Sequence, residues 1–483
     1  MRKILLGTTA VVSAAFGAAV ITPAAAQDAP TVRIGGAMQV YYGLIQQNGA
    51  SSNPGNTPGV TFNSTPFNGS SGGTANAVGI VNPLIPGVAN SGGNFARLGK
   101  SDFISLPTVS VLVSGKSALG FQYGATITIG FNTQEGNLSI GNRVGVGRGT
   151  AVADEAYLEL AHPRFGQIRA GDEDGVMGGL MNSGFITNLG SGGVYGVWEN
   201  FQTRQNGNRT QTGAAQLGDN TKVIYMSPQF FGFDFGVSYA PNGGGFGQSG
   251  CPSDTATSGC DRAYAFRGAT GFAIAPAQSG GPMARRNEFQ VAARYRGSFA
   301  GVGVAATVGY IGGGTARDMT EGGQQVRTMN GHDVWQFGAQ ASYLGVTLGA
   351  NYQFGDYNFF WGNPVRGDRN GQSLNLGASY TAGPITIGSN FVTHLYEGGS
   401  RNTFNPLTGA LTPNSVAAGG AARQRRWAWA VGGNYRLAPG LDLIAEYVYS
   451  SVREQGRDLD VGRAGVQARG QSNVFIIGSR LAF

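Results

Sequence analysis

Polar and apolar residues alternate along several segments of this chain. From Val32 to Leu44 the even positions are apolar apart from one glycine, and the odd positions from Arg33 to Tyr41 are mostly small or polar. The same period of two residues returns at 288–295, 335–343, 426–436 and 441–449. Successive side chains of a β-strand point to opposite faces, so each segment predicts a strand with one apolar and one polar face.

Followed along the whole chain, this alternation predicts sixteen strands. They cover residues 31–45, 101–115, 119–133, 151–162, 166–172, 219–228, 233–240, 284–297, 300–311, 332–344, 345–355, 371–382, 384–396, 424–437, 440–452 and 471–483. The connections alternate between short and long. Short ones lie at 115–118, 163–165, 229–232, 297–299, 344–345, 382–384 and 438–439, and long ones surround 46–100, 134–150, 173–218, 241–283, 312–331, 356–370, 397–423 and 453–470.

An even number of strands joined alternately by short turns and long loops is typical of outer-membrane barrels. We therefore predict an all-β fold, a 16-stranded antiparallel transmembrane β-barrel with short periplasmic turns and long external loops. A soluble all-β protein is the alternative, but it would pack its apolar face on a second sheet and has no reason to alternate loop lengths. Aromatic residues near predicted strand ends favour the barrel, because membrane barrels carry aromatic girdles; they are Tyr41, Tyr42, Tyr295, Tyr310, Trp335, Tyr343, Tyr380, Tyr396 and Tyr435.

Composition agrees with a closed barrel. Charged residues make up 12% of the chain and mean hydropathy is −0.10. Glycine accounts for 83 residues of 483, well above a usual frequency of about 7%. Beyond the N-terminal segment, no stretch approaches the roughly 20 apolar residues that a spanning helix needs.

The N-terminus has the features of an export signal. Arg2 and Lys3 precede an apolar, alanine-rich run, and Ala24 and Ala26 form an A-x-A cleavage motif. We expect residues 1–26 to be a cleaved signal peptide and 27–483 a single barrel domain in the outer membrane. An uncleaved membrane anchor is the alternative, which Pro23 disfavours because proline breaks helices.

Charge and cysteine usage add little specific chemistry. Removing Arg2 and Lys3 lowers the net charge from +7 to +5, and the remaining basic residues are scattered. This distribution argues against nucleic-acid binding, which needs a basic face. Cys251 and Cys260 lie in a Gly/Ser/Pro-rich loop, where an exported protein could form a disulfide.

No pattern indicates an enzyme or a cofactor. His162, His332 and His394 have no metal-binding spacing, and no nucleophile elbow, P-loop or dinucleotide-binding motif occurs. Asp172, Glu173 and Asp174 form the densest acidic run. It is interpreted as the start of a solvated loop, with pore lining or weak Ca²⁺ binding as alternatives.

Three segments resemble Gram-negative general porins of the alphaproteobacterial type. Ala156–Asp174 is similar to a porin hairpin in which a Phe-Gly turn precedes a strand ending in Gly-Asp, and Asn220–Pro241 is similar to the hairpin that follows. Asn473–Phe483 resembles the last strand, with an aromatic C-terminus. The resemblance extends over the mature chain, but its specific motifs are confined to 156–241 and the C-terminus.

The resemblance implies a homotrimer embedded in outer-membrane lipid and lipopolysaccharide, and implies that Phe483 is read by the barrel-assembly machinery. It also implies that the third loop, about 173–218, folds into the lumen with its carboxylates facing arginines on the wall. The loop offers Asp172, Glu173, Asp174 and Glu199, and alternation places on the wall Arg33, Arg169, Lys222, Arg294, Arg296, Arg426 and Arg436. The loop departs from the family pattern because residues 178–193 carry no charge.

These expectations favour a general diffusion porin, since sixteen strands leave an aqueous channel. The excess of inward arginines predicts a weak anion preference. Two alternatives stay open: a substrate-selective outer-membrane channel, and a plugged structural or adhesive barrel.

Overall fold

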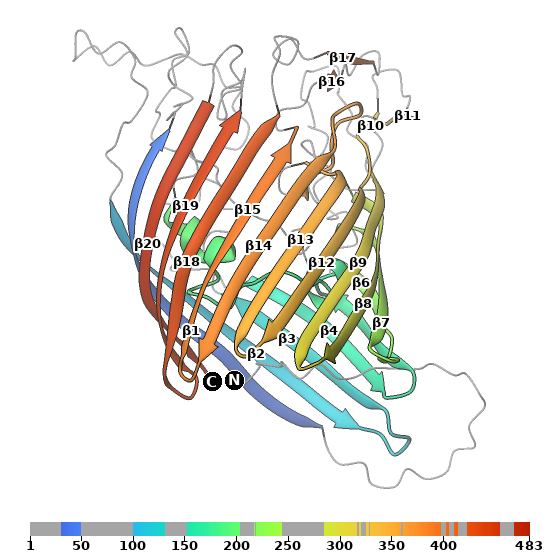
Figure 1. Ribbon diagram of the computed structural model, residues 1–483. Coiled ribbons are helices and arrows are strands. Elements are labelled where there is room, and N and C mark those ends of the chain that lie inside the picture. The colour runs from blue at the N-terminus through green and yellow to red at the C-terminus, as the bar shows by residue number, and fades with distance from the viewer. Residues whose placement is uncertain are drawn as a thin grey trace, which may run out of the picture.

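Sixteen antiparallel strands form a closed barrel in the computed structural model (Figure 1). The structure describes residues 30–49, 100–130, 152–202, 217, 219–243, 285–315, 318–319, 325–327, 329–358, 361–397, 402–404, 410–413, 423–454 and 468–483. In barrel order the strands are β1 (Thr31–Gly49), β2 (Ser101–Lys116), β3 (Gln122–Gly130), β4 (Val152–His162), β5 (Gly166–Asp172), β6 (Thr221–Met226), β7 (Phe233–Asn242), β8 (Arg285–Phe299), β9 (Val302–Thr315), β12 (Asp333–Tyr343), β13 (Val346–Asp356), β14 (Gly371–Ala382), β15 (Ile385–Tyr396), β18 (Gln424–Ala438), β19 (Leu441–Glu454) and β20 (Ala468–Ala482). The predicted fold class and strand number are confirmed.

Alternation along each strand produces the two faces of the wall. In β8, Phe289 and Val291 are exposed on the outside, whereas Glu288 and Gln290 are buried inside. Residues paired across neighbouring strands point to the same face of the wall. The strand pairing therefore identifies the inward positions of every strand once those of one strand are known. The outer surface is therefore mainly apolar and the inner surface mainly small or polar.

Two of the short turns show why the chain reverses where it does. Ala300–Gly301 and Leu344–Gly345 both have positive φ at their two central residues, the geometry of the tight hairpin turns that match the twist of paired strands. The predicted turn at 297–299 was therefore misplaced, because β8 continues to Phe299 before the turn. The Leu344–Gly345 turn was predicted correctly.

The barrel closes between its first and last strands. β1 pairs with β20 from Ala37 opposite Ala482 to Gly49 opposite Gly470. Beyond β20, the amide of Phe483 donates to the carbonyl of Gly36 at 3.1 Å, and the amide of Gly36 donates to the carbonyl of Phe483 at 3.0 Å. The last residue therefore extends the contact that closes the ring.

Other features differ from the sequence predictions. Two short hairpins, β10 (Asp318–Met319) with β11 (Gln325–Val326) and β16 (Asn402–Phe404) with β17 (Leu411–Pro413), occur within long connections. Tyr41 and Tyr396 were expected in the aromatic girdles, but they are only 1% and 2% exposed and belong to clusters inside the barrel. Both occupy inward positions of their strands, so alternation decides their direction.

The predicted signal peptide, Cys251 and Cys260 lie outside the described residues. Within the described part of the chain, no helix is long and apolar enough to cross a membrane.

Candidate functional site

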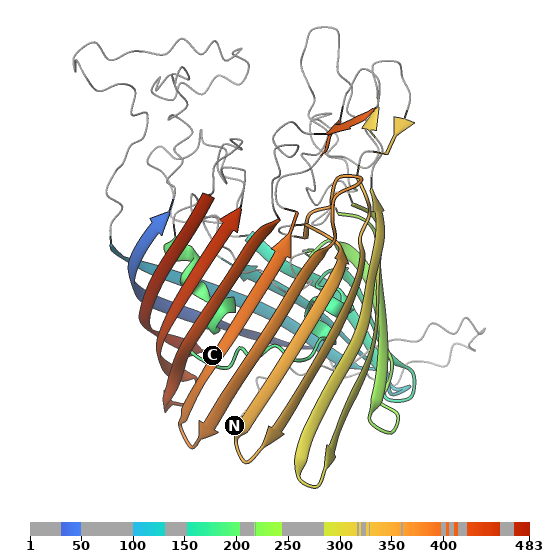
Figure 2. The ribbon, with the colours of Figure 1, turned by 45° about the horizontal axis from the view of Figure 1, so that its top comes forward.

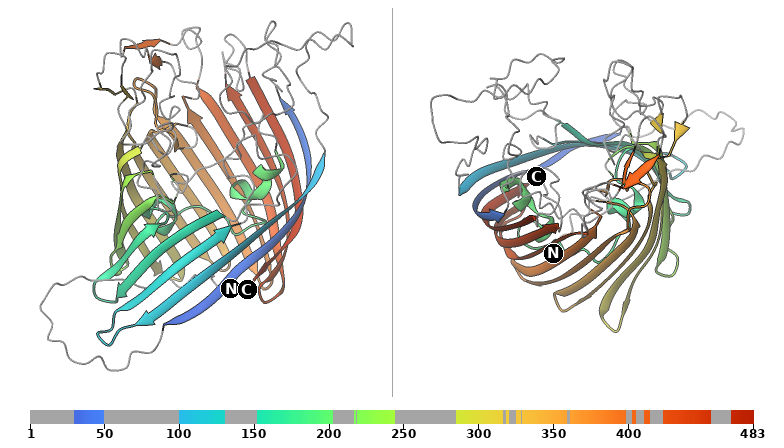
Figure 3. Two further views of the ribbon diagram at one scale, coloured as in Figure 1. Left: turned by 180° about the vertical axis from the view of Figure 1, so that it is seen from behind. Right: turned by 90° about the horizontal axis from the view of Figure 1, so that it is seen from above.

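The described residues 173–202 of the third long connection, between β5 and β6, lie inside the barrel. This stretch contains three short helical segments: η3 (Val176–Leu180), η4 (Gly193–Tyr195) and η5 (Val197–Phe201). Figure 2 and Figure 3 show these green segments within the ring of strands, where they lie near different parts of the wall. The predicted inward folding of loop 3 is therefore confirmed for the described residues 173–202.

The first half of the loop is held by polar side chains on β7, β8, β9 and β13. The amide of Val176 donates to Ser238 Oγ at 3.4 Å, and the amide of Met177 donates to Gln290 Oε1 at 2.9 Å. Ser183 Oγ lies 2.7 Å from Thr307 Oγ1, and the Ser183 carbonyl accepts from Asn351 Nδ2 at 2.9 Å. These strands follow one another around the barrel, so this half of the loop follows the inner wall.

The second half continues along β14, β15 and β19. Glu446 accepts hydrogen bonds from the amides of Ser191 at 2.7 Å and Gly193 at 3.2 Å, and also from the Ser191 hydroxyl. Asn390 accepts from the amide of Val194 at 2.9 Å, and the Tyr195 hydroxyl donates to Asn375 Oδ1 at 2.7 Å. A carboxylate that receives several hydrogen bonds is a strong attachment point.

Apolar contacts attach the two ends of the described stretch 173–202 to different sectors of the wall. Val176, Met177 and Met181 are fully buried in a cluster with inward residues of β6, β8, β9 and β12. Val194, Trp198 and Phe201 belong to a second cluster with inward residues of β1, β15, β18, β19 and β20. The predicted polar lumen therefore contains two apolar areas, and both are covered by the loop.

The acidic run at the start of the loop is paired with nearby basic residues. Glu173 accepts a hydrogen bond from Arg169 at 2.5 Å, and Arg169 also lies 3.6 Å from Glu159. Lys222 on β6 donates to the backbone carbonyl of Glu173, while Asp172 accepts from the Thr221 hydroxyl at 2.6 Å. Glu173 thus pairs with a residue four positions earlier in the chain, which differs from the cross-lumen pairing that the family resemblance implies.

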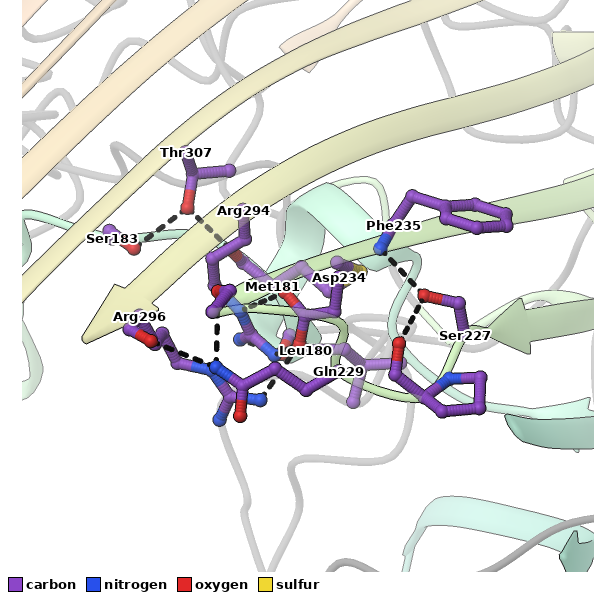
Figure 4. A network of polar contacts seen from close by, with 12 residues as sticks. Leu180, Met181, Ser183, Ser227, Gln229, Asp234, Phe235, Arg294, Arg296 and Thr307 are labelled. Carbon is purple, nitrogen blue, oxygen red and sulfur yellow. Dashed lines mark hydrogen bonds and ion pairs between the residues drawn. The ribbon is translucent and has the colours of Figure 1, made fainter. Parts of the chain in front are cut away.

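A second charged group lies near the short-turn end of β7 and β8 (Figure 4). Asp234 accepts from Arg294 Nη2 at 2.7 Å and from Arg296 Nη2 at 2.8 Å. Arg294 also donates to the carbonyl of Leu180 in η3 at 3.0 Å. One carboxylate faces two guanidinium groups, so this group keeps a net positive charge, and the Arg296 side chain is 49% exposed.

The other predicted site residues are distributed over the wall and the far end of the loop. Arg426 is buried and donates to Gln424 at 2.6 Å. Arg436 is 46% exposed and lies 3.6 Å from Asp442, and Arg33 is exposed on β1. Glu199 lies in η5, beside the second apolar cluster, and so is separated from the acidic run.

Burial changes the protonation of two loop carboxyls. It raises the pKa of Asp174 to about 6, an effect opposed by Lys222 and reinforced by Glu173 and Asp154. Burial also raises the pKa of Asp219 to about 8, with Asp174 adding to the increase and Lys222 opposing it. Both carboxyls therefore change charge near neutral pH.

Several charged residues of the lumen were not predicted as site residues. They are Glu155, Glu159, Asp234, Arg285, Glu288, Glu446 and Arg480, all at inward positions or in contact with inward groups. Alternation could have identified most of them, because all except Arg285 follow or precede an outward apolar residue. Their partners could not be identified in this way, since the contacts join residues up to 255 positions apart.

Among the described residues, no group of three or more His, Cys, Asp or Glu side chains is arranged to hold a metal ion. The site is instead a set of separate charged pairs around a polar lumen, with a neutral loop along part of its wall. Such an arrangement can filter dissolved molecules by size and charge.

Comparisons with known proteins were made for the sequence and for the fold. A family model described as Gram-negative porin matches residues 8–455. No curated protein matches the chain. Similar solved structures include the anion-selective porin from Comamonas acidovorans, with 12% identity, a TM-score of 0.48 and coverage of 94% of this chain and 100% of that chain. They also include in-vitro folded OmpT, an outer membrane protein of Vibrio cholerae (11% identity, TM-score 0.47, 96% and 100% coverage), and the outer membrane channel DcaP of Acinetobacter baumannii (10%, 0.48, 94% and 97%).

Proposed function

Because the chain belongs to the Gram-negative porin family and closes into a sixteen-stranded barrel, it is an outer-membrane channel protein, and we propose that it is a general diffusion porin. Small hydrophilic solutes and ions pass through its lumen by diffusion, with no covalent step and no cofactor. The loop along the inner wall narrows the passage and filters solutes by size. The observation that carries this proposal is the attachment of residues 176–195 to inward side chains on β7–β9, β13–β15 and β19.

Charges in the lumen support a weak preference for anions. Arg33 and Arg480 occupy exposed inward positions, and Arg296 is half exposed. Arg436 is also exposed on the inside, where Asp442 at 3.6 Å compensates part of its charge. The carboxylates of Glu173, Asp234 and Glu446 are buried and bonded to cations or hydrogen-bond donors. Mobile anions therefore meet more uncompensated charge than mobile cations do.

Single-channel recording in planar bilayers tests this function. We expect stepwise conductance from the purified protein, and in a KCl gradient a reversal potential that indicates a modest excess of chloride permeability. The preference should weaken at high salt, because the screening length falls from about 10 Å at 0.1 M to about 3 Å at 1 M. Clear cation selectivity at low salt would contradict the proposed charge filter.

The two alternatives predict different recordings. A substrate-selective channel would be blocked by one class of sugar or anion at concentrations that leave other solutes permeable. A plugged structural or adhesive barrel would give no conductance steps at all. The loop is hydrogen-bonded along the inner wall, which favours an open passage over a plug.

Other features are proposed from family membership. We propose a cleaved signal peptide at 1–26, a homotrimer, contact with lipopolysaccharide and recognition of Phe483 during assembly. Mass spectrometry of the mature N-terminus and electrophoresis of unheated protein test the first two.

A further inference from the structure

A row of inward glycines follows the loop around the barrel. Between residues 176 and 201, the loop contacts inward glycines on seven strands around the ring. These glycines are Gly236 on β7, Gly309 on β9, Gly338 on β12, Gly349 on β13, Gly377 on β14, Gly388 on β15 and Gly43 on β1. We call this set the glycine track.

The contacts of the glycine track leave no room for a side chain. A β-carbon at six of the positions would lie less than 3.0 Å from loop atoms, and one at Gly388 would lie 3.1 Å from Leu189 Cβ. At Gly338 the obstacle is the backbone carbonyl of Ser183, and at Gly349 it is the carbonyl of Gly184, at 2.7 Å. Backbone atoms cannot rotate away as a methionine side chain can, so these two positions are the most restrictive.

Glycine lowers the stability of a strand at such positions, so its presence there argues that it is needed. In a strand interior glycine provides no side chain to pack and loses more conformational entropy on folding than alanine. Its usual role in a strand is to permit the close approach of another backbone. The loop backbone makes this approach at Gly338 and Gly349, and loop side chains make it at the other five positions. These contacts explain part of the chain's high glycine content.

We infer that the glycine track holds the loop flat against the wall and thereby sets the open cross-section of the channel. The inference rests on the proposed function and identifies the residues that position the loop in the channel. The polar anchors, such as Asn351 and Thr307, fix where the loop is attached. The glycines determine how far it projects into the lumen, because any side chain beneath it pushes it toward the axis.

The test compares alanine substitutions at matched positions. The variant Gly338→Ala/Gly349→Ala places two methyl groups under the backbone of residues 183–184. The control is Gly303→Ala on β9, which faces the lumen but has no atom closer than 3.8 Å to the added carbon. We expect a loss of single-channel conductance in the double variant and wild-type conductance in the control.

A cross-link reports the loop position independently. Because Ser183 Oγ and Thr307 Oγ1 are 2.7 Å apart, Ser183→Cys/Thr307→Cys should form a disulfide in a Cys251→Ser/Cys260→Ser background. The disulfide should form less readily when the two alanines are added. Electrophoresis of unheated samples checks that each barrel is folded, and Gly338→Ala alone serves if the double variant does not assemble.

The outcomes separate this inference from the proposed function. A folded variant with conductance equal to or above wild type, or with undiminished cross-linking, would overturn the role of the glycine track. If wild-type protein formed no channel, the proposed function would fail, while the cross-link would still report whether the glycines seat the loop.

Discussion

Carboxylates in this lumen differ in role because they differ in partner. Glu446 is buried and accepts three hydrogen bonds from loop residues, so its charge serves attachment. Asp234 neutralises part of an arginine pair, so it reduces a local positive charge. Residue type alone does not distinguish these roles, because each depends on what the fold brings within hydrogen-bonding distance.

Removing the Glu446 carboxylate should loosen the second half of the loop. Hydrogen bonds to charged groups contribute about 1.5–3 kcal/mol each, so Glu446→Ala should raise the open-channel current noise strongly and Glu446→Gln less. Asp442→Ala is the matched control, since Asp442 lies on the same face of β19 and faces Arg436 instead of the loop. Equal noise in Glu446→Ala and Asp442→Ala would contradict the attachment role.

The exposed arginines should determine selectivity. The double variant Arg436→Glu/Arg480→Glu should move the reversal potential toward cation selectivity, with the largest shift at low salt, where screening is weakest. The charge-preserving variant Arg436→Lys/Arg480→Lys should retain the wild-type value. An identical reversal potential in all three proteins would place the charge filter elsewhere.

At the scale of elements, strands and loop obey different rules. Each strand is specified by a local period of two, which directs its apolar side chains outward. The loop has no such period, and residues 178–193 carry no charge. Its position comes from the glycine track and from hydrogen bonds to inward side chains on β7, β8, β9, β12, β13, β14, β15 and β19.

The ends of the loop should respond to pH. Burial raises the pKa of Asp174 to about 6 and of Asp219 to about 8. For a raised pKa, the stabilising contribution is complete below the unfolded value and is lost as pH rises through the folded value. We therefore expect the anion preference to be weaker at pH 9 than at pH 5, because both carboxyls become charged and the loop ends become less stable.

Reversal potentials at the two pH values measure this effect. The variant Asp174→Asn/Asp219→Asn cannot gain these charges, so its selectivity should change less over the same range. A pH response as large as that of wild type would assign the titration to other groups.

For the whole molecule, closure of the ring depends on the chain ends. Phe483 makes two backbone hydrogen bonds to Gly36 beyond the last strand. Deleting Phe483 should lower the unfolding temperature of the purified barrel, since each bond contributes about 0.5–1.5 kcal/mol. Phe483→Ala keeps both backbone hydrogen bonds, so this variant should retain the wild-type unfolding temperature. If the aromatic ring is read during assembly, the variant should instead lower the amount of protein in the outer membrane.

Thermal shifts of folding-dependent mobility, together with outer-membrane protein levels, distinguish these two effects. Normal membrane levels of Phe483→Ala would argue against an assembly signal in the ring. An unchanged unfolding temperature after deletion of Phe483 would argue against a role of this residue in closing the barrel.

Local pattern was sufficient to predict all sixteen strands of this protein, whereas the inward loop was expected only from the resemblance to porins. The membrane imposes one rule on every strand, because apolar residues must face lipid and backbone groups must be paired. Val32–Leu44 and Glu288–Tyr295 alternate with a period of two, so the direction of most of their side chains could be read from the sequence. The period does not fix turn positions such as Ala300–Gly301, since several glycine-containing sites could reverse the chain there.

Only the tertiary structure decided which inward residues meet. Glu446 and Ser191 are 255 positions apart. Gly338 on β12 lies against Ser183 in the loop. Such contacts depend on barrel registers and on the path of the loop, and no local period encodes them. The sequence by itself determined the wall of the channel, whereas its aperture and charge pairing follow from how the closed ring and the loop fit together.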